Sequence, residues 1–108
     1  MKTQLMKNCS ALEIYVAISQ AIMFNLANFA KEGTGFSVSA YHHPQGEGSD
    51  LDEHEIDVFQ IDGDTKVSIF TTYVKDEETS TEVVECLEKC FPADLVEFHE
   101  TYREKELN

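Results

Sequence analysis

The chain has 108 residues and carries 21 acidic against eight basic side chains, which gives a formal net charge of −13 at pH 7. This length allows one domain with one modest core, and an apolar content of 42% excludes a wholly disordered protein. We therefore expect residues 1–108 to form a single α+β domain.

The acidity is concentrated in the C-terminal half of the chain. Residues 1–46 carry three lysines and two acids (+1), whereas residues 47–108 carry 19 acids and five bases (−14). Such a field repels nucleic acid and anionic membranes and attracts cationic surfaces. We therefore expect a basic protein surface as the partner, and neither direct nucleic-acid binding nor membrane binding.

Residues 10–32 form the longest apolar segment and predict a helix. Ser10 and Glu13 have the spacing of a capping box, in which each side chain bonds to the backbone of the other residue. Lys31 followed by Gly33 is typical of a helix end. We expect this helix to be the element on which the other elements pack.

The predicted helix has one narrow polar stripe, and Ala17 and Phe24 interrupt it. Because its other positions are mostly apolar, we expect the helix to be buried on two sides. If the C-terminal helices cover Phe24 and Ala17, we expect a monomer; if these two residues lie in the open, the helix becomes the seam of a homodimer. Polar residues within the apolar run argue against a signal peptide or a membrane span, so we expect a cytoplasmic protein. They are Glu13, Ser19, Gln20, Asn25 and Asn28.

Alternation of apolar and polar residues predicts three strands, at Phe36–His43, Glu55–Ile61 and Lys66–Val74. Asp62-Gly63 between the last two is typical of a two-residue hairpin turn. Such a turn places Val58 opposite Val67. The strands are then expected to form a three-stranded antiparallel sheet, with the long N-terminal helix packed on one face.

Two helices are expected after the sheet. Thr79 and Glu82 repeat the capping-box spacing, and Pro92 ends the helix that they begin. Residues 94–107 are interpreted as a third helix that packs through apolar residues spaced three or four apart. The expected element order is α-β-β-β-α-α, with one or two C-terminal helices.

Three histidines near an acidic loop, His42, His43 and His54, are a candidate metal site, because imidazole and carboxylate groups together bind divalent transition metals. The EF-hand template fails, since Glu55 and Ile61 occupy the positions of its glycine and its bidentate glutamate. We assign no catalytic residue, no metal site and no cofactor.

The odd number of cysteines indicates reduced thiols; these are Cys9, Cys86 and Cys90.

The acidic side chains of the C-terminal half are the remaining candidates for a functional surface. On the two expected helices they recur every three or four residues, which would form rows of carboxylates on one face. An acidic helix start also argues against the double-stranded-RNA-binding module, whose α-β-β-β-α order is similar. The candidate contact residues are Asp50, Asp52, Glu53, Asp57, Asp76, Glu77, Glu78, Glu82, Glu85, Glu88, Glu97 and Glu104.

In size, composition and expected element order the chain resembles the small acidic antagonists encoded by phages and mobile elements, such as some anti-CRISPR proteins and nucleic-acid mimics, and it resembles bacterial immunity proteins. No stretch matches a family motif, so this resemblance implies no site residue. The leading hypothesis is a non-enzymatic inhibitor that blocks a basic nucleic-acid-binding or nuclease surface. A toxin-immunity protein or antitoxin, and a small homodimeric interaction domain, are the alternatives.

Overall fold

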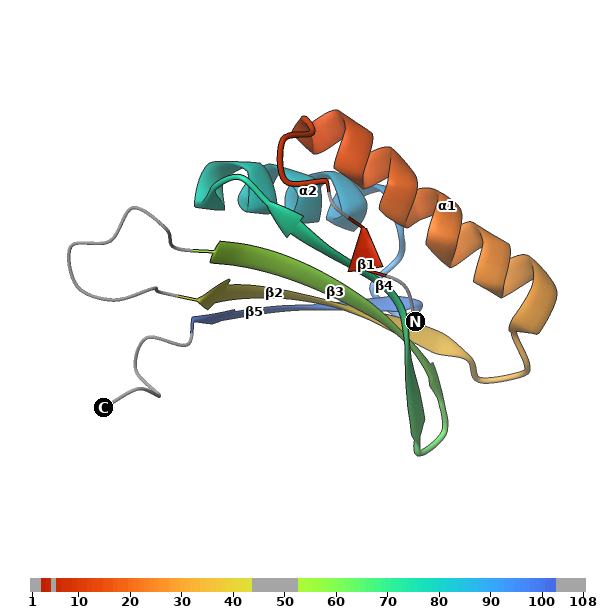
Figure 1. The fold of residues 1–108 in the computed structure, drawn as a ribbon. Helices are drawn as coiled ribbons and strands as arrows, with labels where there is room; N and C mark the ends of the chain where they lie inside the picture. The colour runs from red at the N-terminus through yellow and green to blue at the C-terminus, as the bar shows by residue number, and fades with distance from the viewer. Residues whose placement is uncertain (1–2, 5, 44–52, 103–108) are drawn as a thin grey trace.

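Two helices cover one face of a mixed β-sheet and leave the other face open (Figure 1). The computed structural model describes residues 3–4, 6–43 and 53–102. In chain order the elements are β1 (Thr3–Gln4), α1 (Ala11–Phe29), β2 (Gly35–His43), β3 (Glu53–Asp62), β4 (Thr65–Val74), α2 (Glu77–Cys90) and β5 (Val96–Tyr102). The predicted α+β class is confirmed.

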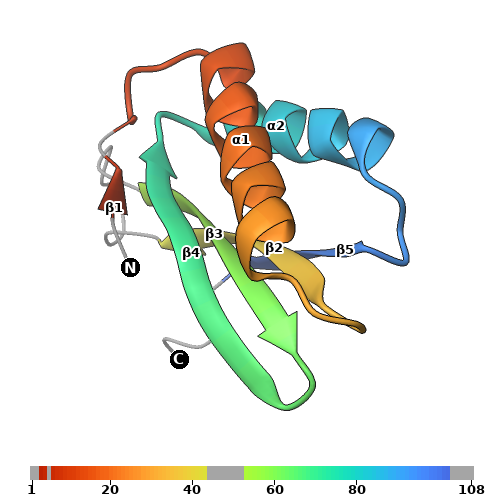
Figure 2. The same cartoon turned by 90° about the vertical axis from the view of Figure 1, so that its right-hand side faces the viewer.

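The sheet has the strand order β1-β4-β3-β2-β5. Strands β2, β3 and β4 form the predicted antiparallel meander, β5 lies parallel to β2 at one edge, and the two-residue β1 lies parallel to β4 at the other. Figure 2 shows α1 and α2 next to each other on the same face of the sheet. The buried core lies between these two layers and comprises Ile14, Ile18, Ile22, Phe36, Val38, Ala40, Ile56, Val58, Phe70, Val74, Val83, Val84, Leu87 and Val96.

The third helix predicted for residues 94–107 is wrong, because Val96–Tyr102 is strand β5. Val96 is buried and pairs with Phe36, while Glu97 is exposed on the opposite face. This alternation has the period of two that a half-buried strand requires. The free edge of β2 supplies the backbone hydrogen-bond partners for this strand.

The expectation that α1 is buried on two sides is also wrong. Ile14, Ile18 and Ile22 have no exposed surface and form one stripe against the sheet. Most of the other large apolar side chains of α1 are exposed. Residues 96–102, which were predicted to lie in a third helix, extend the sheet as β5 beside β2 and do not cover α1.

Both ends of α1 have identifiable caps or turns. Ser10 is the N-cap, and its Oγ accepts a hydrogen bond from the Glu13 amide at 3.2 Å, while the Ser10 amide donates to Glu13 Oε1 at 2.9 Å. The predicted capping box is therefore confirmed, and these hydrogen bonds lower the pKa of Glu13. The helix ends at Phe29, earlier than predicted, and Gly33, with φ +86°, lies in the turn that follows.

The predicted hairpin register is wrong, because the turn lies one residue further along the chain and the ladder of β3 and β4 contains a bulge. Gly63 and Asp64, rather than Asp62 and Gly63, are the central turn residues, and Gly63 adopts a φ of +61°. Val67 therefore lies opposite Gln60 instead of Val58. A bulge follows in the ladder, so that Val58 pairs with Phe70 and both enter the core.

Helix α2 begins earlier than predicted. Asp76 is the N-cap, and its Oδ1 accepts a hydrogen bond from the Thr79 amide at 2.8 Å. Thr79, which was expected to be the cap, is buried within the first turn. Hydrogen bonds from the Thr79 hydroxyl and backbone hold the pKa of Asp76 below its usual value.

The fold depends on the isoleucine stripe of α1, so we expect Ile18→Ala to be strongly destabilising. Because Ile18 has no exposed surface, truncation leaves a cavity and should lower the free energy of unfolding by about 2–5 kcal/mol. Urea denaturation followed by circular dichroism measures this change. Gln20→Ala, an exposed position on the same helix, should change the free energy by no more than about 0.5 kcal/mol; equal effects of the two substitutions would contradict the burial pattern.

The Asp76 cap predicts a pH-dependent contribution to stability. At neutral pH, Asp76→Ala should lower the free energy of unfolding by about 1 kcal/mol. Because the pKa of Asp76 is lower in the folded state, the contribution of its charge is complete above the unfolded pKa of about 3.9 and is lost as the pH falls through the folded pKa.

Asp76→Asn is the matched control for this prediction, because asparagine caps helices without titrating. The difference in unfolding free energy between the wild type and Asp76→Asn should therefore shrink as the pH is lowered below about 4. A difference that stays constant from neutral to acidic pH would show that the Asp76 charge does not contribute.

Candidate functional site: an acidic helix face

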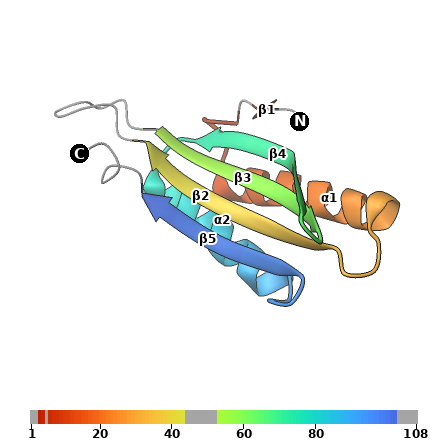
Figure 3. The ribbon, with the colours of Figure 1, turned by 90° about the horizontal axis from the view of Figure 1, so that it is seen from below.

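The predicted acidic contact residues lie on two opposite faces of the molecule. Those of α2 lie in the helix layer, whereas Asp57 and Glu97 lie on the open face of the sheet, which Figure 3 shows from below. The strand register sets this division, because Phe36 and Val96 pair toward the core and their neighbours Ser37 and Glu97 pair on the other face. The chain therefore does not bring all these carboxylates together in one surface.

Three of the predicted contact residues, Asp50, Asp52 and Glu104, lie outside the described residues, and Glu53 is the first residue of β3. Within the described residues there is no third helix to carry the expected row of acids, since Glu97 belongs to a strand. What remains of the predicted surface is the acidic face of α2.

Helix α2 is divided into an apolar and an acidic face. Its buried side faces the sheet and α1, and consists of Thr79, Ser80, Val83, Val84 and Leu87. Its exposed side carries all five of its glutamates, Glu77, Glu78, Glu82, Glu85 and Glu88. We call these five residues the acidic face of α2. Glu77 and Glu78 lie in the first turn, where the positive end of the helix dipole stabilises negative charge.

The carboxylates of this face are weakly compensated. Glu78, Glu82, Glu85 and Glu88 make no ion pair with any side chain in the described part of the chain. The one basic residue of α2 is Lys89, in its last turn. Neighbouring glutamates three or four residues apart have Cβ atoms about 5–6 Å apart, so their negative potentials add along the helix.

The open face of the sheet has a different character. Glu97 Oε1 lies 3.6 Å from His99 Nε2, and the ammonium of Lys66 lies 4.5 Å above the centre of the Phe59 ring. Ser37 and Ser39, which have short side chains, lie on β2 between these two pairs and are buried by their neighbours. Charges of both signs occur here, so this face offers a less uniform negative potential than α2.

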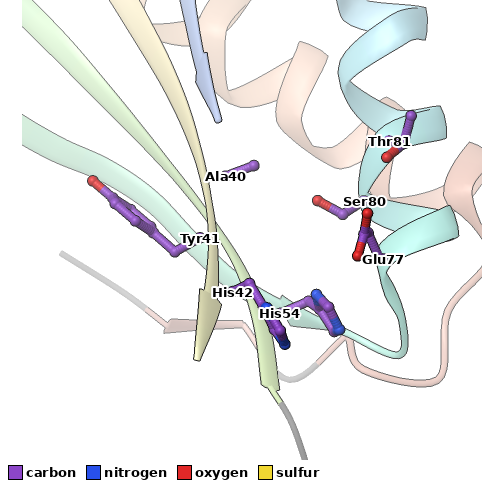
Figure 4. Close-up of a pocket in the computed structure, with 7 residues that line it drawn as sticks. All are labelled: Ala40, Tyr41, His42, His54, Glu77, Ser80 and Thr81. Atoms are coloured by element: carbon purple, nitrogen blue, oxygen red, sulfur yellow. The ribbon is translucent and has the colours of Figure 1, made fainter. Parts of the chain in front are cut away.

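The histidines named as a candidate metal site are only partly brought together. His42 and His54 pair across β2 and β3, and their rings stack with centroids 4.7 Å apart and an interplanar angle of 6°. Figure 4 shows the two rings on the side of the strands that faces the first turn of α2, next to Glu77. The cavity between these elements measures about 10 Å³, room for about one water molecule.

His43 ends β2 and pairs with Glu53 in the strand register. Within the described residues, no group of three or more histidine, cysteine, aspartate or glutamate side chains could hold a metal ion. The described part of the chain therefore supplies two stacked imidazoles but no ligand set.

A second hollow, of about 280 Å³, lies where β2 and β5 begin. Its volume is slightly below the range of about 300–1,000 Å³ that is usual for small-molecule sites. Its lining includes the backbone of the turn before β2 and two acids, Asp94 and Glu97.

The three cysteines are free. The Sγ of Cys90 lies 2.7 Å from the hydroxyl of Tyr15, and this contact joins α2 to α1 and raises the pKa of Tyr15.

Helix α1 has an exposed apolar face, of which the sequence had indicated only Phe24 and Ala17; Phe24 is exposed and Ala17 is half-buried. In the described part of the chain, α1 is the helix that is long and apolar enough to cross a membrane by length and composition, a criterion that core helices and signal sequences also meet. Ile14, Ile18 and Ile22 nevertheless pack it against the sheet. The spacing of its other apolar residues is the signal from which this second face could have been found.

No protein-family model matches the chain, and neither the comparison with curated proteins nor the comparison with solved structures gives a match.

Proposed function

We propose that the chain is a non-enzymatic binding protein that docks the acidic face of α2 on the basic surface of a nucleic-acid-handling enzyme and thereby inhibits it. The observation that carries the proposal is the presence of five exposed glutamates on one 14-residue helix. The charge difference between the two halves of the chain, +1 against −14, also indicates a basic partner for the C-terminal half.

The linear density of charge on α2 supports nucleic-acid mimicry. From Glu77 to Glu88 the helix rises about 17 Å at 1.5 Å per residue. Five carboxylates over this length correspond to about one negative charge per 3–4 Å of helix axis, and one strand of B-DNA carries one phosphate per about 3.4 Å of its axis. A basic groove built for a phosphate backbone could therefore bind this helix with its charges matched.

The chemistry of such a groove suits carboxylates as well as phosphates. Arginine forms bidentate hydrogen bonds with both groups, and lysine attracts both as a point charge. The exposed glutamates of α2 would reach these side chains from the helix surface, so association is steered by long-range attraction and weakens as salt is added. The negative sign of the same field disfavours nucleic acid itself as the ligand.

The test is affinity capture from a host lysate with two matched variants. The first variant replaces Glu78, Glu82, Glu85 and Glu88 by glutamine, which removes four charges while retaining helix propensity. The second, Glu97→Gln, removes a charge from the open face of the sheet. Circular dichroism checks that both variants are folded.

We expect the wild type and Glu97→Gln to capture a basic nucleic-acid-binding protein that the four-glutamine variant does not capture, and we expect about 0.5 M salt to release it. The captured protein is then purified, and its binding to a labelled oligonucleotide is measured by fluorescence anisotropy. The wild type should compete with the oligonucleotide, and the four-glutamine variant should compete at least about tenfold more weakly.

Two results would contradict the proposal. One is that the four-glutamine variant captures the same proteins as the wild type. The other is that a captured partner keeps its nucleic-acid binding and its activity when saturated with the wild type. If the partner is instead a toxin that the wild type neutralises through α2 without competing for nucleic acid, the immunity-protein alternative replaces this proposal.

A further inference from the structure

Helix α1 carries a group of exposed apolar side chains, most of them on the side away from the isoleucine stripe. Large apolar residues occupy six of its 19 positions with between 37% and 66% of their surface exposed. They are Leu12 (66%), Met23 (58%), Phe24 (58%), Phe29 (57%), Val16 (41%) and Leu26 (37%). Phe24 and Phe29 contact each other edge to face, with ring centroids 6.0 Å apart.

Four of these residues follow the heptad spacing of a coiled coil. Leu12, Val16, Met23 and Leu26 are separated by four, seven and three residues, which places leucines at d positions and Val16 and Met23 at a positions. We call these four residues the α1 seam. Ser19 is the remaining d position, and its half-buried side chain places Oγ inside the protein. Because a branched residue at a with leucine at d favours two strands, the pattern suits pairing with one other helix.

The heptad pattern is independent of the core packing. Of the three isoleucines that hold α1 on the sheet, Ile14 and Ile18 fall at f and c positions, away from the seam, and Ile22 falls at a g position, which borders it. The core therefore does not require apolar residues at the seam. The apolar residues of the seam therefore need a reason other than core packing, and contact with a helix of another molecule is such a reason.

The exposed area is close to the lower limit for a stable homodimer. If each side chain is assigned about 200 Å², the middle of the range for aromatic residues and an upper value for Leu, Val and Met, six side chains that are one-third to two-thirds exposed present at most about 600 Å² per copy. Two copies would then bury at most about 1,200 Å² of side-chain surface, which is the lower limit for stable protein interfaces. Contacts from the residues around the seam would add to this area.

The charge distribution selects a second copy rather than a membrane. Glu13 is the one acidic or basic residue between Ala11 and Phe29, so two copies can approach through α1 while the acidic residues 47–108 repel each other elsewhere. Helices that lie on membrane surfaces are usually rich in lysine and arginine on their polar face, and α1 has neither. Crossing a bilayer would remove three fully buried isoleucines from the core.

We infer that the α1 seam pairs with the same seam of a second copy, so that the chain forms a two-fold symmetric homodimer. Leu12, Val16, Met23 and Leu26 supply the contact, with Phe24 and Phe29 at its border. Salt screens the repulsion between the two acidic halves, so the dimer becomes tighter as salt is added. This dependence is opposite to that of the proposed binding of α2 to a basic partner.

Analytical ultracentrifugation of the full chain tests the inference. At about 50 µM protein the wild type should sediment with twice the 12.2 kDa mass of the chain. Met23→Glu places a charge in the seam at an exposed position, so it should keep the fold and raise the dimer dissociation constant at least about tenfold. Asn28→Glu adds the same charge on α1 outside the seam and should leave the dissociation constant nearly unchanged.

Three results would overturn the inference. The first is a wild type that keeps the monomer mass up to about 1 mM protein. The second is a dimer that Met23→Glu and Asn28→Glu weaken equally, which would place the contact elsewhere. The third is a monomeric wild type that floats with phosphatidylcholine vesicles while Met23→Glu does not, which would assign the seam to a lipid surface.

Discussion

The packing of three isoleucines from α1 on the sheet is the contact on which the rest of the structure depends. Ile14, Ile18 and Ile22 are completely buried, one helical turn apart. They cover the core-facing residues of the meander, of which Val38 and Val58 pair with each other in the strand register. This single stripe fixes the rotation of α1, and thereby decides which of its other apolar residues are exposed to solvent.

The same contact defines the two surfaces to which we assign binding. Helix α2 packs beside α1 through Val83, Val84 and Leu87, which turns its glutamates outward. The α1 seam consists of apolar residues alone, and the acidic face of α2 consists of glutamates alone. Because their interactions respond oppositely to salt, each surface can be tested without the other. A dimer formed through α1 would present two acidic helices to its partners, which would increase avidity for an extended basic groove.

The extent to which sequence predicted the fold can be judged from particular residues. The Ser10–Glu13 capping box and the alternation in Phe36–His43 are local signals, and both predicted their elements. The segment 95–102 is compatible with both a strand and a helix. Val96 and Phe98 alternate with polar residues, as in a strand, while Leu95, Phe98 and Tyr102 are spaced three and four residues apart, as in a helix. The free edge of β2 decides between them, and that edge is a tertiary feature that local pattern does not contain.

The errors at the candidate site follow from the same misassigned segment. Interpreting residues 94–107 as a helix placed a second row of acids on it and made it a possible cover for α1, whereas the described residues 96–102 form strand β5. The acids of α2 were predicted correctly as exposed because their helical period is unambiguous. The α1 seam could have been found from its spacing of four, seven and three residues, but an apolar helix in a small protein is normally assigned to the core.

Intermolecular paramagnetic relaxation enhancement in NMR tests most directly whether α1 has one face for the core and one for a second copy. One copy carries a spin label at Ala27→Cys, beside the seam, in a variant whose three native cysteines are replaced by serine. This copy is mixed with isotopically labelled protein that carries no spin label. We predict that the amide signals of Val16, Met23 and Leu26 in the isotopically labelled copy are broadened, while those of Gly63 and Asp64 at the hairpin tip are not. Full intensity at all three seam positions, at protein concentrations near the millimolar range, would contradict the account.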